Sequence, residues 1–126
     1  MNILAAFDKY KESMTADEAC SIAAKAAQEI TGSDCKIIET PLTDGGEGFC
    51  AILTKAAFGK IELHSVNGPL GQTVRAPIGW VSPNQIPKSV FKNLGNGHGP
   101  LAIIEMASAA GLQQVPFEKR HPRQTS

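Results

Sequence analysis

The alternation of short apolar runs with helical patterns constrains the fold of this 126-residue chain most strongly. Residues 3–7 form a continuous apolar run, which is typical of a strand buried on both faces. A capping-box pattern joins Thr15 to Glu18, and the apolar residues that follow recur at helical spacing as far as Gly32. Residues 35–42 predict a second strand. This order predicts a βαβ unit, in which the two strands are parallel.

The rest of the chain continues the alternation less regularly. The predicted elements are a helix at 49–58, strands at 61–66 and 72–81, an exposed loop at 82–100, a strand at 101–104 and a short helix at 106–111. We therefore predict an α/β fold with a mainly parallel, Rossmann-like sheet. The strand pattern changes after the turn at 67–71, so the chain is expected to leave its first α/β domain near residue 70.

The charge balance and the cysteines limit the partners and the compartment. Twelve basic and twelve acidic side chains give a formal net charge of zero, so attraction to a nucleic acid backbone is not expected. The three cysteines contain no CxxC pair, which favours free thiols in a reducing compartment over disulfides or metal ligands. The first residues have no basic region and too short an apolar run for a signal peptide or a membrane span, so the cytoplasm is the expected location. The sequence does not define an oligomeric state.

Acidic side chains follow three of the predicted strands. Asp8, Asp44 and Glu105 each come just after a predicted strand. Ligands of parallel α/β sheets bind at the carboxyl ends of the strands. We therefore expect a binding site at this edge.

The glycine-rich segment that begins at Asp44 is the most informative stretch. Gly45 and Gly46 allow the backbone to approach a ligand closely, and the helix that follows offers unpaired N–H groups to an anion. Asp44 and Glu47 would repel a bare phosphate, but they suit Mg²⁺ placed before phosphate groups, or a carboxylate that orients a substrate hydroxyl. A glycine-rich turn whose acids cap the next helix explains the same residues equally well.

The loop after the first strand carries further polar groups. Asp8 can accept a proton or bind a metal, Lys11 can pair with an anionic oxygen, and Ser13 can donate its hydroxyl. Taken alone, this segment fits an ordinary solvated loop better, although its predicted position beside the Asp44 loop favours function. The glycines at 95–99 match no dinucleotide fingerprint, no GxxxxGK[ST] segment is present, and the histidines lack metal-site spacing.

Five segments together resemble the bacterial-type glycerate kinases. They are DKYKESMTA at 8–16, PLTDGGEG at 41–48, VNGPLG at 66–71, EMASAAGL at 105–112 and RHPRQTS at 120–126. They lie in the order that the family shows and cover most of the chain. His121 departs from the Asp or Asn that is usual there, which puts in doubt how Arg120 is held.

The resemblance implies transfer of the γ-phosphoryl group of ATP, with Mg²⁺, to D-glycerate, forming a phosphoglycerate with 2-phosphoglycerate as the expected product. It also implies two α/β domains with the substrate cleft between them. Residues 1–70 would then form a partial first, Rossmann-like domain with an incomplete sheet, and residues 71–126 the truncated beginning of a second α/β domain. The residues carried over by motif are Asp8, Lys11 and Asp44 for catalysis, Ser13, Gly45, Gly46, Glu47, Glu105 and Arg120 for substrate binding, and Asp44 and Glu47 for the metal.

Length is the largest departure from the family. Family members continue into further glycine-rich segments that are expected to serve the nucleotide, so this chain alone is not expected to complete the reaction. Open sheet edges and uncovered apolar faces are predicted as a consequence. The alternative to a kinase fragment is a non-catalytic truncated chain, or an α/β module that binds a small molecule or phosphate weakly.

Overall fold

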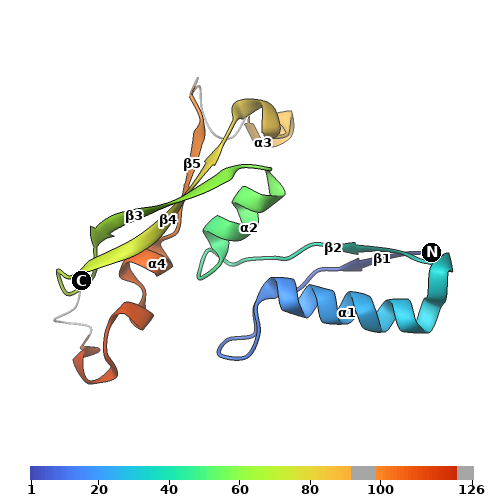
Figure 1. Ribbon diagram of the computed structural model, residues 1–126, viewed down its shortest axis with the longest axis horizontal. Coiled ribbons are helices and arrows are strands. Elements are labelled where there is room, and N and C mark those ends of the chain that lie inside the picture. Colours follow the sequence, from blue (N-terminus) through green and yellow to red (C-terminus); the bar gives the residue numbers. More distant parts are fainter. Residues whose placement is uncertain (92–98, 122–126) are drawn as a thin grey trace. The chain divides into compact units, whose positions relative to one another are not determined.

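The computed structural model describes residues 1–91 and 99–121, which form a mixed α/β structure (Figure 1). The chain divides into two compact units, Met1–Asp44 and Gly45–Ser126. The glycine cluster at 95–99, except Gly99, and the last five residues of the RHPRQTS motif lie outside the described residues. The division after Asp44 concerns compactness within this chain, and the domain boundary expected near residue 70 stays a prediction.

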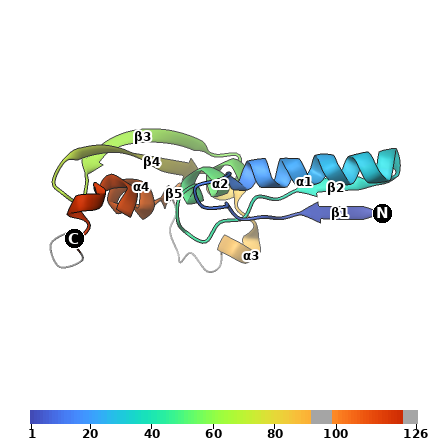
Figure 2. The same ribbon diagram turned by 90° about the horizontal axis from the view of Figure 1, so that it is seen from below.

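The first unit is the βαβ unit that the sequence predicts. Strand β1 (Asn2–Ala5) pairs in parallel with β2 (Lys36–Glu39), and helix α1 (Ala16–Thr31) connects them and runs alongside both (Figure 2). The two segments stay paired beyond the strands, because the Leu42 N–H donates to the Phe7 carbonyl at 2.9 Å. The loops that begin at residues 8 and 43 therefore start side by side.

Helix α1 begins and ends where its capping residues predict. The Thr15 hydroxyl accepts from the Glu18 N–H at 3.2 Å, and Glu18 Oε2 accepts from the Thr15 N–H at 2.7 Å. The Thr15 hydroxyl also donates to Glu18 Oε2 at 2.9 Å. The two hydrogen bonds that the carboxylate accepts, from the Thr15 N–H first and the Thr15 hydroxyl second, hold the pKa of the exposed Glu18 carboxyl below its ordinary value of 4.5. At the other end Gly32 has a φ of 63°, which glycine adopts without strain.

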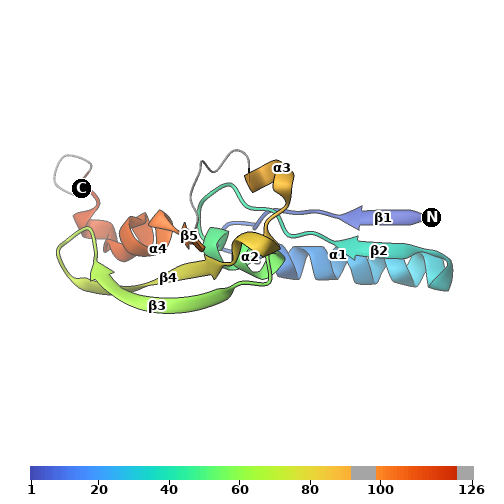
Figure 3. The same ribbon diagram turned by 90° about the horizontal axis from the view of Figure 1, so that it is seen from above.

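The second unit contains a three-stranded antiparallel sheet in the order β3-β4-β5 (Figure 3). Its elements are α2 (Phe49–Ala56), β3 (Lys60–Asn67), β4 (Thr73–Val81), α3 (Lys88–Phe91), β5 (Leu101–Ile104) and α4 (Met106–Ala110). Short 3₁₀ helices complete the described chain at Gly32–Asp34, Pro83–Gln85, Leu112–Gln114 and Phe117–Lys119.

The α/β class and the parallel pairing of the first two strands are confirmed, but the remaining strands differ from the mainly parallel sheet that the sequence predicts. The turn at 68–72 joins β3 directly to β4, and so short a connection permits only an antiparallel hairpin, since parallel strands need a long crossover. The predicted loop at 82–100 also contains a 3₁₀ helix and the one-turn helix α3.

The core of the second unit lies between α2 and the sheet. Cys50, Val81 and Ile103 are buried against one another. Gly79 lets α2 approach β4, because a Cβ added there would overlap Thr54 Oγ1. Cys20, Cys35 and Cys50 are buried free thiols.

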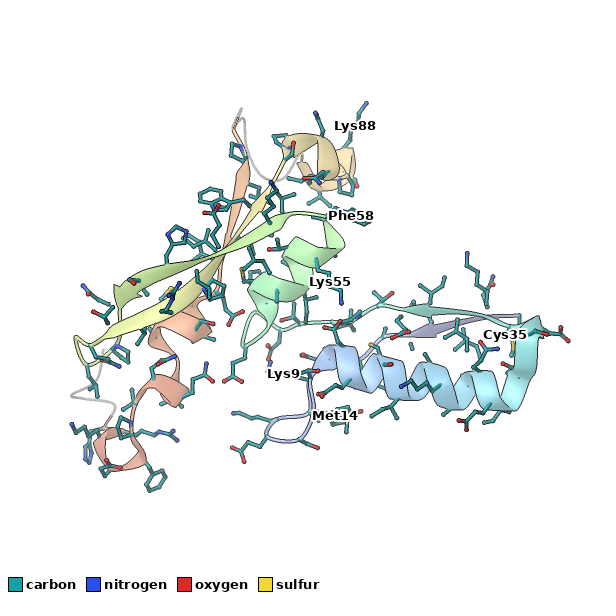
Figure 4. The ribbon with its side chains drawn as sticks, in the orientation of Figure 1. Lys9, Met14, Cys35, Lys55, Phe58 and Lys88 are labelled. Carbon is teal, nitrogen blue, oxygen red and sulfur yellow. The ribbon has the colours of Figure 1, made fainter. Side chains whose placement is uncertain are left out.

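Apolar side chains remain uncovered on both units, as predicted. Leu4 and Ile38 lie opposite each other in the parallel pair and are 62% and 42% exposed. Phe58, labelled in Figure 4, is 85% exposed at the turn after α2. Ile61, Leu63 and Ile104 are likewise exposed on the antiparallel sheet. Among the described residues, no helix is long and apolar enough to span a membrane.

Candidate functional site

The carboxyl ends of β1 and β2 bring together the two acidic residues that follow them. Lys9 Nζ lies 2.9 Å from Asp44 Oδ1 and 3.9 Å from Asp8 Oδ1. The Lys9 N–H also donates to Asp8 Oδ1 at 2.7 Å. One ammonium group therefore links the loop after β1 to the loop after β2, in the part of the sheet where a ligand is expected.

Sequence reasoning assigned no role to Lys9. The family motif leaves its position open, so the resemblance carried nothing over to it. Two features of the sequence point to Lys9. It directly follows Asp8, and the predicted parallel pairing of the two strands brings it close to Asp44. Its side chain is only 21% exposed, whereas that of Asp44 is 65% exposed. Asp44 therefore keeps the accessible surface that a substrate group needs, while the amine between the acids is largely covered.

Lys11 and Ser13 lie in a tight turn within the loop that follows Asp8. The turn is closed by the Tyr10 N–H, which donates to the Met14 carbonyl at 2.9 Å, and by the Ser13 N–H, which donates to the Tyr10 carbonyl at 2.9 Å. Lys11 and Ser13 are both exposed. Within the described part of the chain, their side chains are not joined to Asp8 or Asp44 by a hydrogen bond or ion pair. Their predicted roles therefore depend on a ligand.

The glycine-rich segment forms a turn that leads directly into α2. Gly45 and Gly48 have φ values of 91° and 89°, in the left-handed region that other residues rarely adopt. The Gly46 carbonyl accepts from the N–H of Phe49, the first residue of α2, at 3.2 Å. Glu47 is exposed at the tip of the turn. Two positions of the turn thus adopt backbone conformations that glycine takes without strain, while close approach to a ligand stays a prediction.

A metal site shared by Asp44 and Glu47 stays a prediction, because the two residues belong to different units. The described residues contain no group of three or more His, Cys, Asp or Glu side chains that could hold a metal ion. Mg²⁺ commonly takes only one or two carboxylates together with substrate phosphates. The exposed oxygens of Asp44 and Glu47 are of the chemical type that this binding mode needs.

Glu105 and Arg120 occupy different environments in the second unit. Glu105 is 4% exposed, and its carboxylate accepts from the Cys50 N–H at 3.0 Å and from the Ser108 hydroxyl. Arg120 is exposed, donates from Nε to the Val115 carbonyl at 2.9 Å, and places its guanidinium 5.8 Å from the centre of the Phe117 ring. Within the described chain no hydrogen bond or ion pair joins Glu105 to Arg120.

The fold and these side chains define an α/β chain whose acidic residues and glycine-rich turn follow its strands, an arrangement typical of enzymes that bind small polar substrates. The chain belongs to the glycerate kinase family, whose model matches residues 3–126.

Individual relatives match over the same extent. The chain is 37% identical over 126 residues to a glycerate 2-kinase of Escherichia coli K12, covering 100% of this chain and 29% of the relative. It is 37% identical over 123 residues to a glycerate kinase of Bacillus subtilis 168, covering 97% of this chain and 28% of the relative. A solved glycerate kinase structure from Salmonella typhimurium LT2 superimposes with a TM-score of 0.69 at 36% identity, covering 100% of this chain and 30% of that one. The chain therefore spans less than a third of the length of these relatives.

Proposed function

We propose that this chain is the substrate-side portion of a glycerate kinase, an enzyme that transfers the γ-phosphoryl group of ATP to D-glycerate with Mg²⁺ and forms 2-phosphoglycerate. The observation that carries the proposal is the arrangement of Asp8 and Asp44 around Lys9, in a chain that matches the glycerate kinase family along its length. The name of the Escherichia coli relative, glycerate 2-kinase, supports the choice of hydroxyl.

The proposed chemistry divides between groups that orient the attacking hydroxyl and groups that balance charge. Asp44 is exposed and can accept a hydrogen bond from the glycerate hydroxyl, with Asp8 as the alternative acceptor. Lys11 and Arg120 supply cations for the phosphoryl oxygens, a task in which bound Mg²⁺ would neutralise further charge. Ser13, Glu47 and the backbone of Gly45 and Gly46 are the proposed contacts to the substrate.

A second candidate is supported by the length of the match. Because this chain spans less than a third of the relatives, it is also a candidate for a non-catalytic chain that binds glycerate or a phosphate weakly. A small-molecule ligand is common to both candidates, and the zero net charge favours neither a nucleic acid nor an anionic surface as a partner. The two candidates differ only in whether these 126 residues can support phosphoryl transfer when the rest of the fold is supplied.

The test uses the 126-residue chain and a chimera in which it replaces the matching segment of the Escherichia coli glycerate 2-kinase. We expect no D-glycerate-dependent ATP consumption from the chain alone and measurable consumption from the chimera, in a coupled assay with circular dichroism recorded in parallel. Turnover by the chain alone would show that the missing portion is not needed. If the chimera folds but neither protein binds D-glycerate by calorimetry, the proposed substrate is wrong.

Within the chimera, Asp44→Asn tests the role given to the exposed carboxylate. Asn keeps the size of the side chain but is a weaker acceptor, so turnover should fall by about 10²–10⁴-fold while the chimera stays folded. Asp34→Asn, in the 3₁₀ helix after α1, is the matched control and should leave turnover unchanged. Turnover close to that of the parent chimera in the Asp44 variant would contradict the assignment.

A further inference from the structure

Helix α2 has no cap from its own sequence. Gly48 occupies the N-cap position with a φ of 89° and has no side chain to accept a hydrogen bond, and the first turn contains no acidic residue. The first N–H groups of a helix have no partner inside the helix and need an acceptor, above all when they are buried. The acceptor for α2 must therefore come from another part of the fold.

Glu105 supplies that acceptor from 55 residues away in the sequence. Its Oε2 accepts from the N–H of Cys50, the second residue of α2, at 3.0 Å, and both residues are buried. A carboxylate at this place also interacts favourably with the positive end of the helix dipole. The N–H of Cys50 therefore already has an anionic acceptor within the protein.

The same carboxylate ties α2 to two further elements. Glu105 directly follows β5, and its second oxygen accepts from the hydroxyl of Ser108 in α4. Cys50 is held a second time, because its thiol donates to the carbonyl of Ile103 in β5 at 3.4 Å. Both oxygens of Glu105 are thus engaged inside the unit, and its burial leaves it almost no surface for a substrate.

The glycine-rich turn directly precedes α2 in the chain. The N–H of Phe49, next to Cys50, donates to the carbonyl of Gly46, so the first turn of the helix and the glycine turn share a hydrogen bond. Gly45 and Gly48 have no Cβ and tolerate many backbone conformations, so contacts made outside the turn can influence which one it keeps. The hydrogen bond from Cys50 to Glu105 is one such contact, made at the first turn of the helix into which the turn leads.

We propose that Glu105 is a positioning residue of the glycerate-binding turn, which acts through the first turn of α2 and does not contact the substrate. This inference rests on the proposed function, which identifies glycerate as the ligand of the turn. The hydrogen bond between Cys50 and Glu105, however, can be measured without any ligand.

The test compares three variants of the ¹⁵N-labelled 126-residue chain. Glu105→Ala removes the acceptor. Glu105→Gln keeps it, since the amide oxygen can accept from Cys50 while the amide nitrogen donates to the Ser108 oxygen. Val81→Ala is the matched control, because it opens a cavity in the same core but leaves both hydrogen bonds of Glu105 in place. The measurements are amide hydrogen exchange and D-glycerate affinity by calorimetry.

We expect Glu105→Ala to accelerate exchange of the Cys50 amide by about tenfold or more and to weaken D-glycerate binding by a similar factor. The amides of the β3–β4 hairpin should change by no more than about twofold. Glu105→Gln should restore both the exchange rate and the affinity to within about threefold of the unsubstituted chain. A purely structural role would instead give Val81→Ala and Glu105→Ala equal losses of affinity.

Two results would overturn the inference. One is an unchanged exchange rate for the Cys50 amide in Glu105→Ala. The other, which applies even if that variant does not fold, is the absence of a scalar coupling across the hydrogen bond between the Cys50 nitrogen and the Glu105 carboxyl carbon in the unsubstituted chain. Failure of both the unsubstituted chain and the folded chimera to bind D-glycerate contradicts the proposed function instead, so the two failures can be told apart.

Discussion

At the scale of single residues, the ammonium group of Lys9 balances charge where two carboxylates meet. Asp8 and Asp44 lie at the ends of neighbouring parallel strands, and without a cation between them they would repel each other and any anionic ligand. The pair with Asp44 is short, but the Asp44 side chain is mostly exposed to water, which limits what the ion pair adds to stability. We expect the Lys9 ammonium group to have a larger effect on the electrostatic potential that an approaching anion meets at this edge of the sheet.

Lys9→Met should therefore affect ligand binding more than folding. Loss of the ammonium removes the positive charge that lies beside both carboxylates, so we expect the affinity for anionic D-glycerate to fall about tenfold, and the loss to shrink at high salt. The free energy of unfolding should change by less than about 1 kcal/mol. Calorimetry at low and high ionic strength and urea unfolding measure the two effects.

Lys25→Met, at an exposed position of α1, removes the same charge away from the acids and is the matched control. An equal loss of affinity in both variants would mean that only the net charge of the chain matters, and it would contradict a local role for Lys9.

At the scale of secondary structure, helix α1 depends on its capping box. The hydrogen bonds from Thr15 hold the pKa of Glu18 below 4.5, so the ionised form is favoured in the folded chain relative to the unfolded one. A carboxyl with a depressed pKa adds stability above its unfolded pKa, and this contribution is lost as the pH falls through the folded pKa. The acidic side of pH 4.5 is therefore where α1 should weaken.

The prediction is that Glu18→Gln removes part of the acid sensitivity of α1. Followed by circular dichroism between neutral and strongly acidic pH, the parent chain should lose helix content below pH 4.5, and the variant should lose less over the same range. Glu29→Gln, which alters an exposed carboxylate in the last turn of the same helix, should leave the acid transition unchanged. If both variants behave like the parent, the capping carboxylate does not contribute to the pH dependence.

The contact between α2 and β4 is the tightest in the second unit. Gly79→Ala places a methyl group against Thr54 Oγ1, so we expect the free energy of unfolding to fall by about 1–3 kcal/mol. Gly99→Ala is the control, because a Cβ added there meets no atom within 4 Å. In urea unfolding, Thr54→Ala combined with Gly79→Ala should recover part of the loss. A cost for Gly79→Ala no greater than that for Gly99→Ala would contradict this packing.

The sequence predicts local elements better than their pairing. The capping box and Gly32 define both ends of α1 because their effects are local, and the apolar run at 3–7 correctly predicts a strand. The expected burial of that strand on both faces is wrong, because Leu4 in β1 is 62% exposed in a sheet of only two strands. The alternation of strands and helices does not predict the antiparallel second sheet. The direction of pairing there depends on the short turn at 68–72, which permits only a hairpin. Asp8 and Asp44 were correctly expected to lie together, because parallel pairing follows from the βαβ order.

Two features of the site could not be derived from the sequence. Glu105 stands at the end of a strand as predicted, but its burial beneath the start of α2 depends on a contact across 55 residues. Lys9 was overlooked because its role requires the three-dimensional meeting of two loops. In both cases the sequence shows the residue type and its position in the chain, but it does not show which residues that side chain contacts in the fold.

At the scale of the whole molecule, uncovered apolar surface is combined with a lack of repulsive charge. Leu4 and Ile38 form an exposed apolar pair on β1 and β2, and the two-stranded sheet has open edges that can accept another strand. The formal net charge is zero, so little electrostatic repulsion keeps two copies apart. In the absence of any other polypeptide, the chain is expected to cover this surface by associating with itself.

We expect sedimentation velocity to show concentration-dependent association of the purified chain, together with binding of a dye that reports exposed apolar surface. Replacing the apolar pair by Leu4→Lys and Ile38→Glu should weaken the association by about tenfold or more, because it removes two apolar side chains from the proposed contact. The new lysine and glutamate have opposite charges, so the net charge of the chain does not change. Ile22→Lys combined with Ile30→Glu makes the same exchange on exposed positions of α1 and should have a smaller effect. Equal effects of the two double variants would show that association is unspecific. A parent chain that sediments as a monomer at all concentrations would show that the exposed pair on β1 and β2 does not drive association.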